Sequence, residues 1–180
     1  MSRHIGVAPD FGGDHVGLRR EQWARELPDL DTVGMAVLGR ARWISLIVRP
    51  AIEDVFRRHG LDTGEFDVVA TLLRSGPPYR LRPTELYRSL MISSGGLTNR
   101  LARLERAGLV RRVESGDDAR SLPVELTEKG RTTAEAAIRA DMECEAALLA
   151  GLSGDERDTL GRLLCKLAIS LDRTPRGDPS

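Results

Sequence analysis

The sequence contains few of the residues that bind metals or form disulfides, and it has no long apolar run of the kind that spans a membrane. Among 180 residues there are two cysteines, Cys144 and Cys165, and three histidines. Both cysteines lie in helical patterns without ligand-like neighbours, so we expect small buried hydrophobic residues there rather than a disulfide or a metal site. No apolar run reaches the roughly 18 residues of a membrane-spanning helix. We therefore expect no metal, no disulfide and no membrane segment.

The sequence also shows no arrangement of residues that is typical of an enzyme active site. His4 and His15 lie near the N-terminus in a segment without periodicity, and His59 ends an expected helix. There is no serine–histidine–aspartate set, no metal-ligand spacing and no glycine-rich phosphate loop. Residues 1–17 also lack the apolar centre of a secretory signal. We expect a cytoplasmic protein that is not an enzyme and needs no cofactor.

The chain has no excess of charge of either sign, because 27 basic residues balance 27 acidic ones. The balance hides a local asymmetry, since residues 74–112 contain nine arginines against two glutamates. The remainder of the chain is correspondingly acidic. A basic segment within a neutral chain indicates a localised surface for a polyanion such as DNA.

Hydrophobic periodicity divides the chain into helical segments. A short helix at about 18–27 ends at Pro28, and apolar residues spaced three and four apart follow from Asp31 to Gly60. The expected organisation is a disordered tail over 1–17, N-terminal helices for ligand binding and dimerisation over 18–61, a DNA-binding lobe over 62–127, C-terminal dimerisation helices over 128–172 and a tail over 173–180.

The central segment has the pattern of a winged helix-turn-helix. Asp62 caps a helix with Phe66, Ala70 and Leu73 expected to face inward, and a Ser-Gly-Pro-Pro run breaks it. Two more short helices and two alternating strands follow. The expected elements are helices at 83–90 and 94–107 and strands at 109–114 and 122–127. The fold class is therefore mainly α with a small β-hairpin wing.

The helix expected at 94–107 has two unlike faces. On a wheel of 100° per residue its leucines, Leu97, Leu101 and Leu104, cluster on the side that packs inward. The opposite face carries small residues, an asparagine and arginines, which suit contacts with base edges, and the serines at the helix start suit a phosphate. The candidate DNA contacts are Ser93, Ser94, Gly95, Thr98, Asn99, Arg103, Arg106 and, in the wing, Arg120.

Arg120 follows the acidic turn between the two expected strands. A single arginine at a wing tip can enter a narrow minor groove. The alternative is a solvated turn arginine that pairs with Asp117 or Asp118. The neighbouring helix-turn-helix favours the contact with DNA.

Four short motifs between Arg82 and Arg131 form a specific pattern. They are Leu97-Thr98-Asn99-Arg100-Leu101, Gly108-Leu109-Val110-Arg111-Arg112, Asp118-Ala119-Arg120-Ser121 and Leu126-Thr127-Glu128-Lys129-Gly130. This pattern resembles the winged-helix core of the MarR family of bacterial transcription regulators, and the layout of that family extends over about residues 18–171. The resemblance implies a homodimer with intertwined N- and C-terminal helices, which represses genes from a palindromic operator on the nucleoid until a small phenolic, organic acid or oxidant releases it.

Four residues resemble a more specific subgroup. Trp23 on an added N-terminal helix, Asp67, Arg100 and Arg112 match the ligand site of the urate-responsive members. The resemblance implies a small anionic ligand, either urate or a carboxylate such as citrate or aconitate. Arg100 lies roughly 67° from the centre of the leucine face, so it borders the buried side of the helix. The alternatives are a structural Arg100–Asp67 ion pair and a Trp23 that only packs in the core.

Two other functions remain possible for this fold. A thiol-based peroxide sensor needs a reactive cysteine, and here Cys144 and Cys165 both lie late in the chain. A winged helix can also serve protein contacts alone, but the arginine excess over 74–112 favours DNA.

Overall fold

The computed structural model describes residues 12–90, 96–113 and 122–172 of the chain. They divide into two compact units, residues 1–50 and 51–180, which are described separately. The boundary between these units lies inside helix α2 (Arg40–Arg58). The reason is that the last turns of α2 carry buried Val55 and Phe56, which belong to the core of the second unit.

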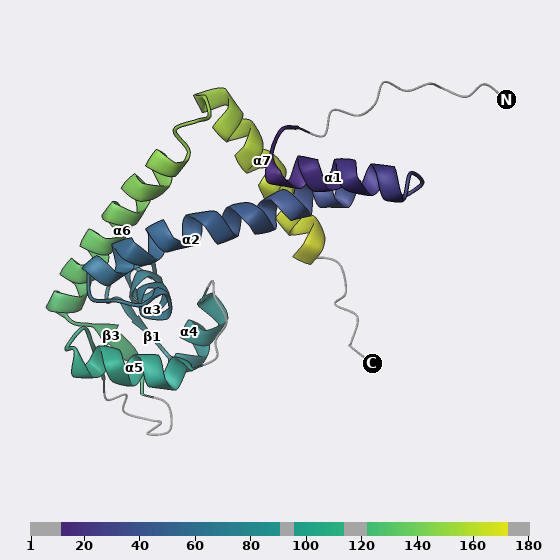
Figure 1. The fold of residues 1–180 in the computed structure, drawn as a ribbon. Coiled ribbons are helices and arrows are strands. Elements are labelled where there is room, and N and C mark those ends of the chain that lie inside the picture. The colour runs from purple at the N-terminus through teal and green to yellow at the C-terminus, as the bar shows by residue number, and fades with distance from the viewer. Residues whose placement is uncertain (1–11, 91–95, 114–121, 173–180) are drawn as a thin grey trace, which may run out of the picture. The chain divides into compact units, whose positions relative to one another are not determined.

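The N-terminal unit opens with helix α1 (His15–Glu26), shown in purple in Figure 1. This helix begins three residues before the predicted start at Leu18. Asp14 is the reason, because its side chain accepts a hydrogen bond of 2.8 Å from the Gly17 backbone N–H and so caps the helix. The prediction of an irregular tail reaching residue 17 is wrong at its last residues.

A π-helical turn, η1 (Met35–Gly39), precedes α2 directly. The sequence predicted one uninterrupted helical pattern here and did not reveal the turn. π-helical turns inside helices are rare and often mark functional sites. Pro50 lies within α2.

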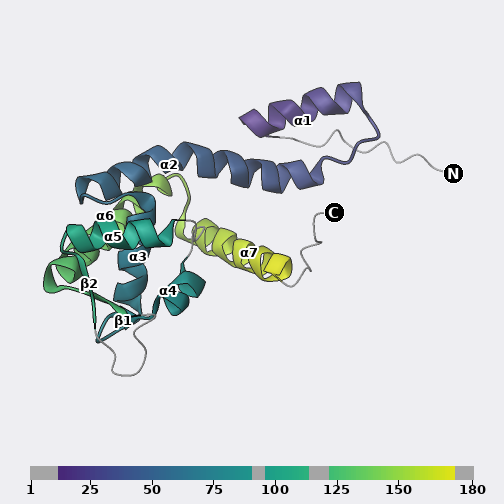
Figure 2. The ribbon, with the colours of Figure 1, turned by 90° about the horizontal axis from the view of Figure 1, so that it is seen from below.

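The second unit contains the winged lobe and the two C-terminal helices. Helix α3 lies against α6, and α5 lies beside the strands of the wing, as Figures 1 and 2 show. After the end of α2, the elements of this unit are α3 (Thr63–Arg74), β1 (Arg80–Leu81), α4 (Pro83–Ser89), α5 (Leu97–Arg106), β2 (Val110–Arg112), β3 (Val124–Leu126), α6 (Glu128–Leu148) and α7 (Gly154–Asp172).

The wing is an antiparallel sheet of three strands in the order β1-β3-β2. The predicted hairpin is present as β2 and β3, with Arg111 opposite Glu125. The sequence missed β1, which pairs with β3 through Arg80 opposite Glu125. A strand of two residues has no alternation to detect, so only its pairing reveals it.

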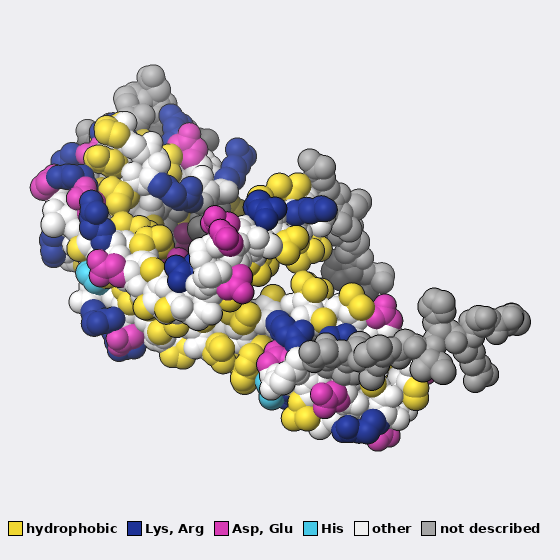
Figure 3. All heavy atoms as spheres, turned by 90° about the horizontal axis from the view of Figure 1, so that it is seen from above, with side chains coloured by type: hydrophobic (Ala, Val, Ile, Leu, Met, Phe, Trp, Pro, Cys, Tyr) yellow, Lys and Arg dark blue, Asp and Glu magenta, His cyan; other side chains and the backbone are white. Residues whose placement is uncertain are grey.

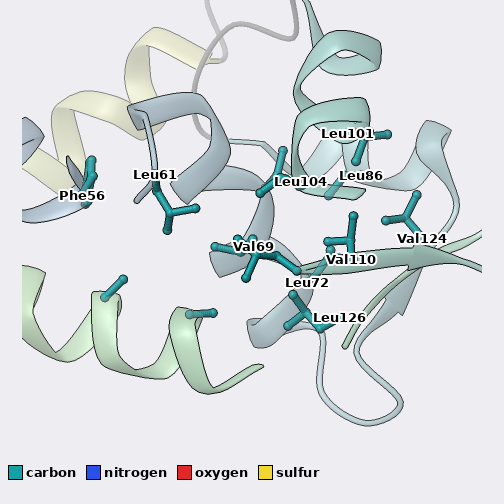
Figure 4. Packing of buried hydrophobic residues seen from close by; sticks show 14 of the residues in the cluster. Phe56, Leu61, Val69, Leu72, Leu86, Leu101, Leu104, Val110, Val124 and Leu126 are labelled. Carbon is teal, nitrogen blue, oxygen red and sulfur yellow. The ribbon is translucent and has the colours of Figure 1, made fainter. Parts of the chain in front are cut away.

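The core of the lobe surrounds α3, as Figure 4 shows. Val68, Val69 and Leu72 have no exposed surface. The predicted leucine face of α5 is confirmed, because Leu101 and Leu104 are buried and Leu97 is partly buried. On α3, by contrast, the predicted inward residues Phe66, Ala70 and Leu73 are only partly buried.

Helix α6 begins in close contact with the wing. Thr127 caps it by accepting a hydrogen bond of 2.9 Å from the Gly130 N–H, and its own N–H donates to the Leu109 carbonyl at 3.0 Å. A Cβ on Gly130 would lie 1.8 Å from that carbonyl oxygen. Only glycine therefore allows this approach of α6 to the start of β2.

Helix α7 has no buried residue. Leu163 and Leu171 are among its exposed apolar side chains, and Figure 3 shows that many hydrophobic side chains reach the surface. Cys165 is exposed and Cys144 is partly buried, so the expectation that both are buried is wrong for Cys165. Of the described helices, none is long and apolar enough to cross a membrane.

Candidate nucleic-acid interface and ligand site

The recognition helix α5 starts later than predicted. Gly96, the N-cap residue, has a φ of 80°, which is left-handed and not helical, so the helix begins at Leu97. Ser93, Ser94 and Gly95, predicted to contact DNA, lie outside the described residues. Arg120 does as well, so the structure describes neither its predicted minor-groove contact nor the acidic alternative.

Thr98, Asn99 and Arg106 are exposed on α5, opposite the leucine face. Asn99 and Thr98 also line a pocket of about 570 Å³ between α4 and α5. The pocket is lined by Pro83, Thr84, Tyr87, Arg88, Gly96, Leu97, Thr98 and Asn99. Helix α4 thus adds Arg88 and Tyr87, an arginine and an exposed aromatic ring, to the surface that the sequence assigned to α5 alone. The excess of arginine over 74–112 was the only indication of Arg88.

Arg103 is held by the N-terminus of α3. Its Nη2 lies 2.5 Å from Asp62 Oδ2, and its Nε lies 2.6 Å from Glu65 Oε1. The other oxygens of these carboxylates form the capping box of α3, because Asp62 Oδ1 accepts from the Glu65 N–H at 2.7 Å and Glu65 Oε2 accepts from the Asp62 N–H at 2.9 Å. The cap therefore fixes both carboxylates where they bind Arg103.

This arrangement of Asp62, Glu65 and Arg103, called here the Arg103 clamp, gives Arg103 a contact that the sequence did not predict. Glu65, and to a smaller extent Asp62, raises the pKa of Arg103 above its ordinary value. Since two donor nitrogens are used within the lobe, Arg103 joins the recognition helix to α3. Its contact with guanine or phosphate stays a prediction.

Arg100 crosses the first turn of α3. A Cβ on Gly64 would lie 2.1 Å from Arg100 Nε and 2.6 Å from its Cζ, so the guanidinium occupies the space that any other residue at 64 would fill. A pocket of about 390 Å³ opens at this place. It is lined by Asp62, Thr63, Gly64, Gly96, Asn99, Arg100 and Arg103. Arg100 thus borders the interior side of α5, as the helical wheel predicted.

Asp67 is buried on α3, with 8% of its surface exposed. Because Gly64 and Asp67 are three residues apart, they face the same side of α3, and Arg100 passes over that side. The geometry is compatible with the predicted association of Asp67 and Arg100. Their ion pair stays a prediction.

The other two predicted ligand residues are Arg112 and Trp23. Arg112 on β2 has its Nε 3.3 Å from Glu105 Oε1, at the last turn of α5, and it does not line the pocket at Arg100. Trp23 lies on α1 in the N-terminal unit, with 42% of its surface exposed. The structure therefore gives Arg112 an acidic neighbour, Glu105, that an anion would have to replace.

A buried glutamate on the central strand of the wing binds arginines on both neighbouring strands. Glu125, with 7% of its surface exposed, accepts hydrogen bonds from Arg111 Nη2 at 2.5 Å and from Arg80 Nε at 2.6 Å. These bonds, chiefly that of Arg111, hold the pKa of Glu125 below its ordinary value. One carboxylate on the central strand thus joins β1 and β2. Sequence reasoning missed this set because β1 itself was missed.

Comparison with known proteins agrees with this geometry. The MarR family model matches residues 59–121, which span α3 to the wing. The chain is 38% identical over 144 residues to the HTH-type transcriptional regulator PecS from Dickeya dadantii, covering 80% of this chain and 87% of that protein.

Two solved structures extend the likeness. The MarR family protein Rv2887 from Mycobacterium tuberculosis, complexed with salicylic acid, is 30% identical with a TM-score of 0.59, covering 78% of this chain and 99% of that one. A mutant MarR from E. coli complexed with operator DNA has a TM-score of 0.62 at 24% identity, covering 81% and 96% of the two chains. With its winged lobe, its basic recognition helix and this degree of identity, the chain belongs to the MarR family of DNA-binding transcriptional regulators.

Proposed function

We propose that this regulator is a repressor that binds a palindromic operator as a homodimer and is released by a small anionic ligand. The single observation that carries the proposal is the position of Arg100, whose guanidinium lies across Gly64 and connects the recognition helix to α3. A charge placed there can respond to an anion and move the DNA-reading helix. Ligand occupancy and operator affinity are thereby coupled.

DNA binding rests on the exposed face of α5 and on the wing. Thr98, Asn99 and Arg106 are exposed to reach base edges and phosphates, and Arg88 of α4 adds a cation beside them. The remaining proposed contacts are Ser93, Ser94 and Gly95 before the helix, Arg120 in the wing, and Arg103 if DNA draws it from its carboxylates.

Dimerisation is supported by apolar side chains that the described chain leaves exposed. On α7 they include Leu163 and Ile169, and before and within α2 they include Val33, Ile44 and Ile47. Exposed apolar side chains gathered on a helix are typical of a surface that contacts another protein. In a dimer the two α5 helices would read half-sites about 34–36 Å apart, so a small rotation of either lobe weakens both contacts.

The proposed ligand is an anion that Arg100 and Arg112 bind, with Trp23 and Asp67 completing the site. Arg112 can take part if the anion displaces Glu105, because a carboxylate ligand offers the same bidentate acceptors. Urate is the first candidate, and citrate or aconitate the second. The salicylic acid bound by Rv2887 adds an aromatic carboxylate to the ligands worth testing. Binding would draw Arg100 from Gly64 and loosen α5 on α3.

The decisive experiment measures operator binding by fluorescence anisotropy, using duplex DNA from upstream of the gene. Urate, citrate, aconitate and salicylate are titrated into the complex. At least one should release the wild-type protein, and R100A should keep its DNA affinity but resist release. R106A should instead bind DNA more weakly from the start.

R57A provides the matched control, since Arg57 forms only an exposed helical ion pair with Asp54. It should behave as wild type in both measurements. An R100A protein that dissociates at the same ligand concentration as wild type would contradict the proposal.

Oxidation is a second candidate trigger, favoured by the exposure of Cys165. Peroxide would then release the operator, dithiothreitol would restore binding, and C165S would be insensitive. Release that persists in both C165S and C144S excludes a thiol mechanism.

A further inference from the structure

The N-terminal unit contains a groove that is separate from the Arg100 pocket. Two side-chain contacts hold α1 in place beside it. Arg40 binds Asp14 in a bidentate ion pair, with Nε 2.9 Å from Oδ2 and Nη2 2.7 Å from Oδ1, and Arg20 Nε donates to Thr32 Oγ1 at 3.1 Å. The Arg40 guanidinium holds the pKa of Asp14 below its ordinary value. The ion pair and the hydrogen bond therefore fix the position of α1, which forms one wall of the groove.

The floor of the groove is apolar and tightly packed. Val16 of α1 has 4% of its surface exposed. A Cβ on Gly39 would lie 3.2 Å both from Val16 Cγ1 and from Met35 Cγ, so this glycine lets α1 approach closely. Met35 and Gly39 are the two ends of the π-helical turn, which places a rare backbone feature in the groove.

The lining of the groove combines cations with an aromatic face. Its volume is about 590 Å³, within the range of small-molecule sites. The ring of Trp43 lies against His15 with 4.3 Å between centroids. No aspartate or glutamate is among the lining residues, which are His15, Val16, Arg19, Met35, Gly39, Arg42, Trp43, Ser45, Leu46 and Arg49.

We propose that this groove binds an aromatic or heteroaromatic carboxylate, with its ring against Trp43 and its carboxylate on the arginines of α2. An indole face suits a flat ring, and a guanidinium fork suits a carboxylate. A small carboxylate neutralises these arginines while leaving them partly hydrated.

The test follows the indole N–H resonance of Trp43 in nitrogen-15 labelled protein. The chain has two tryptophans, so W23F leaves Trp43 as the only indole signal. Salicylate and urate are the probes, added separately. We expect a saturable shift of the Trp43 signal with at least one probe, and nuclear Overhauser effects between salicylate ring protons and the indole.

The arginines are tested by the double variant R42A/R49A, in the W23F background. Its affinity for the probe should fall at least tenfold. The matched control is R57A/R58A, which removes two arginines at the other end of α2 and should leave affinity unchanged. R100A should also leave the Trp43 shift unchanged, because Arg100 lines a different pocket.

Three results would overturn the inference. One is the absence of a saturable Trp43 shift with both probes. Another is a shift that survives R42A/R49A, and the third is a shift lost in R100A. The Overhauser contacts keep the test valid if the double variant folds poorly. Failure of the Arg100 proposal appears instead as normal operator release in R100A, so the two outcomes are distinguishable.

Discussion

Substituting alanine for Gly64 should separate ligand response from folding. The new Cβ would lie 2.1, 2.6 and 2.8 Å from Nε, Cζ and Cδ of Arg100. These atoms belong to the outer part of a flexible side chain, so Arg100 moves and the backbone stays. Gly64 lies in the first turn of α3 without a positive φ, and alanine is favoured over glycine in a helix by up to about 1 kcal/mol. The free energy of unfolding should therefore change by less than about 1 kcal/mol.

The functional effect of G64A should be larger than its effect on stability. With Arg100 displaced, the ligand concentration that releases half of the operator should shift by about tenfold or more, the equivalent of roughly 1.4 kcal/mol. Basal operator affinity should change little, since the Arg103 clamp still joins α5 to α3. Anisotropy titrations and thermal unfolding measure both quantities. A G64A protein with wild-type ligand response would refute the reasoning.

Gly130 provides the control for this steric argument. There the added Cβ would lie 1.8 Å from the Leu109 backbone oxygen and 2.8 Å from its carbonyl carbon. Backbone cannot rotate away, so α6 or β2 must shift, at a cost of about 3 kcal/mol or more. G130A should therefore unfold at a temperature lower by several degrees. Equal stability of G64A and G130A would show that the identity of the obstructing atoms does not matter.

Three further substitutions test the ion pairs and the buried carboxylate. R103A should weaken operator binding several-fold while lowering the melting temperature only slightly, because Arg103 and Asp62 are solvent-exposed. Unchanged binding would exclude a positioning role. E125Q should destabilise the lobe at pH 7 by about 1–3 kcal/mol. Arg111 and Arg80 lower the pKa of Glu125 in the folded protein. The stabilisation by the ionised carboxylate is therefore present above the ordinary carboxyl pKa and is lost as pH falls through the lowered folded-state pKa. Denaturant unfolding curves of E125Q and wild type should accordingly converge in acid. D141N should raise the melting temperature at pH 7 by about 2–4 °C. The reason is that burial and Glu145 raise the pKa of Asp141, and its Oδ1 has no hydrogen-bond partner within the described chain. The gain should vanish at acidic pH, and a lower melting temperature at pH 7 would contradict the prediction.

Local sequence determined the parts of the fold that depend on neighbouring residues. The leucine spacing on α5 correctly placed Leu101 and Leu104 in the core, and Asp62 caps α3 where predicted. These features need only helical periodicity and one side chain near a free backbone N–H. The family pattern identified the winged lobe for the same reason, because its motifs are contiguous.

Other elements depended on contacts that sequence alone does not display. Strand β1 exists only through pairing with β3, across 45 residues between Arg80 and Glu125. The buried side of α3 was predicted only in part. Phe66 and Leu73 pack against the core but are partly exposed. The fully buried residues are Val68, Val69 and Leu72, which the sequence pattern did not single out. A helix packed on several sides has apolar residues around much of its surface, so its pattern does not indicate one inward face.

The site itself was divided in the same way. The chain specified which arginines belong to the recognition helix and which of them border its buried side. Only the folded structure brings Arg103 to Glu65 across 38 residues, and Arg100 to Gly64. Charges far apart in the chain acquire partners when packing brings two helices together, and a glycine shows what it makes room for only when its neighbour is in place.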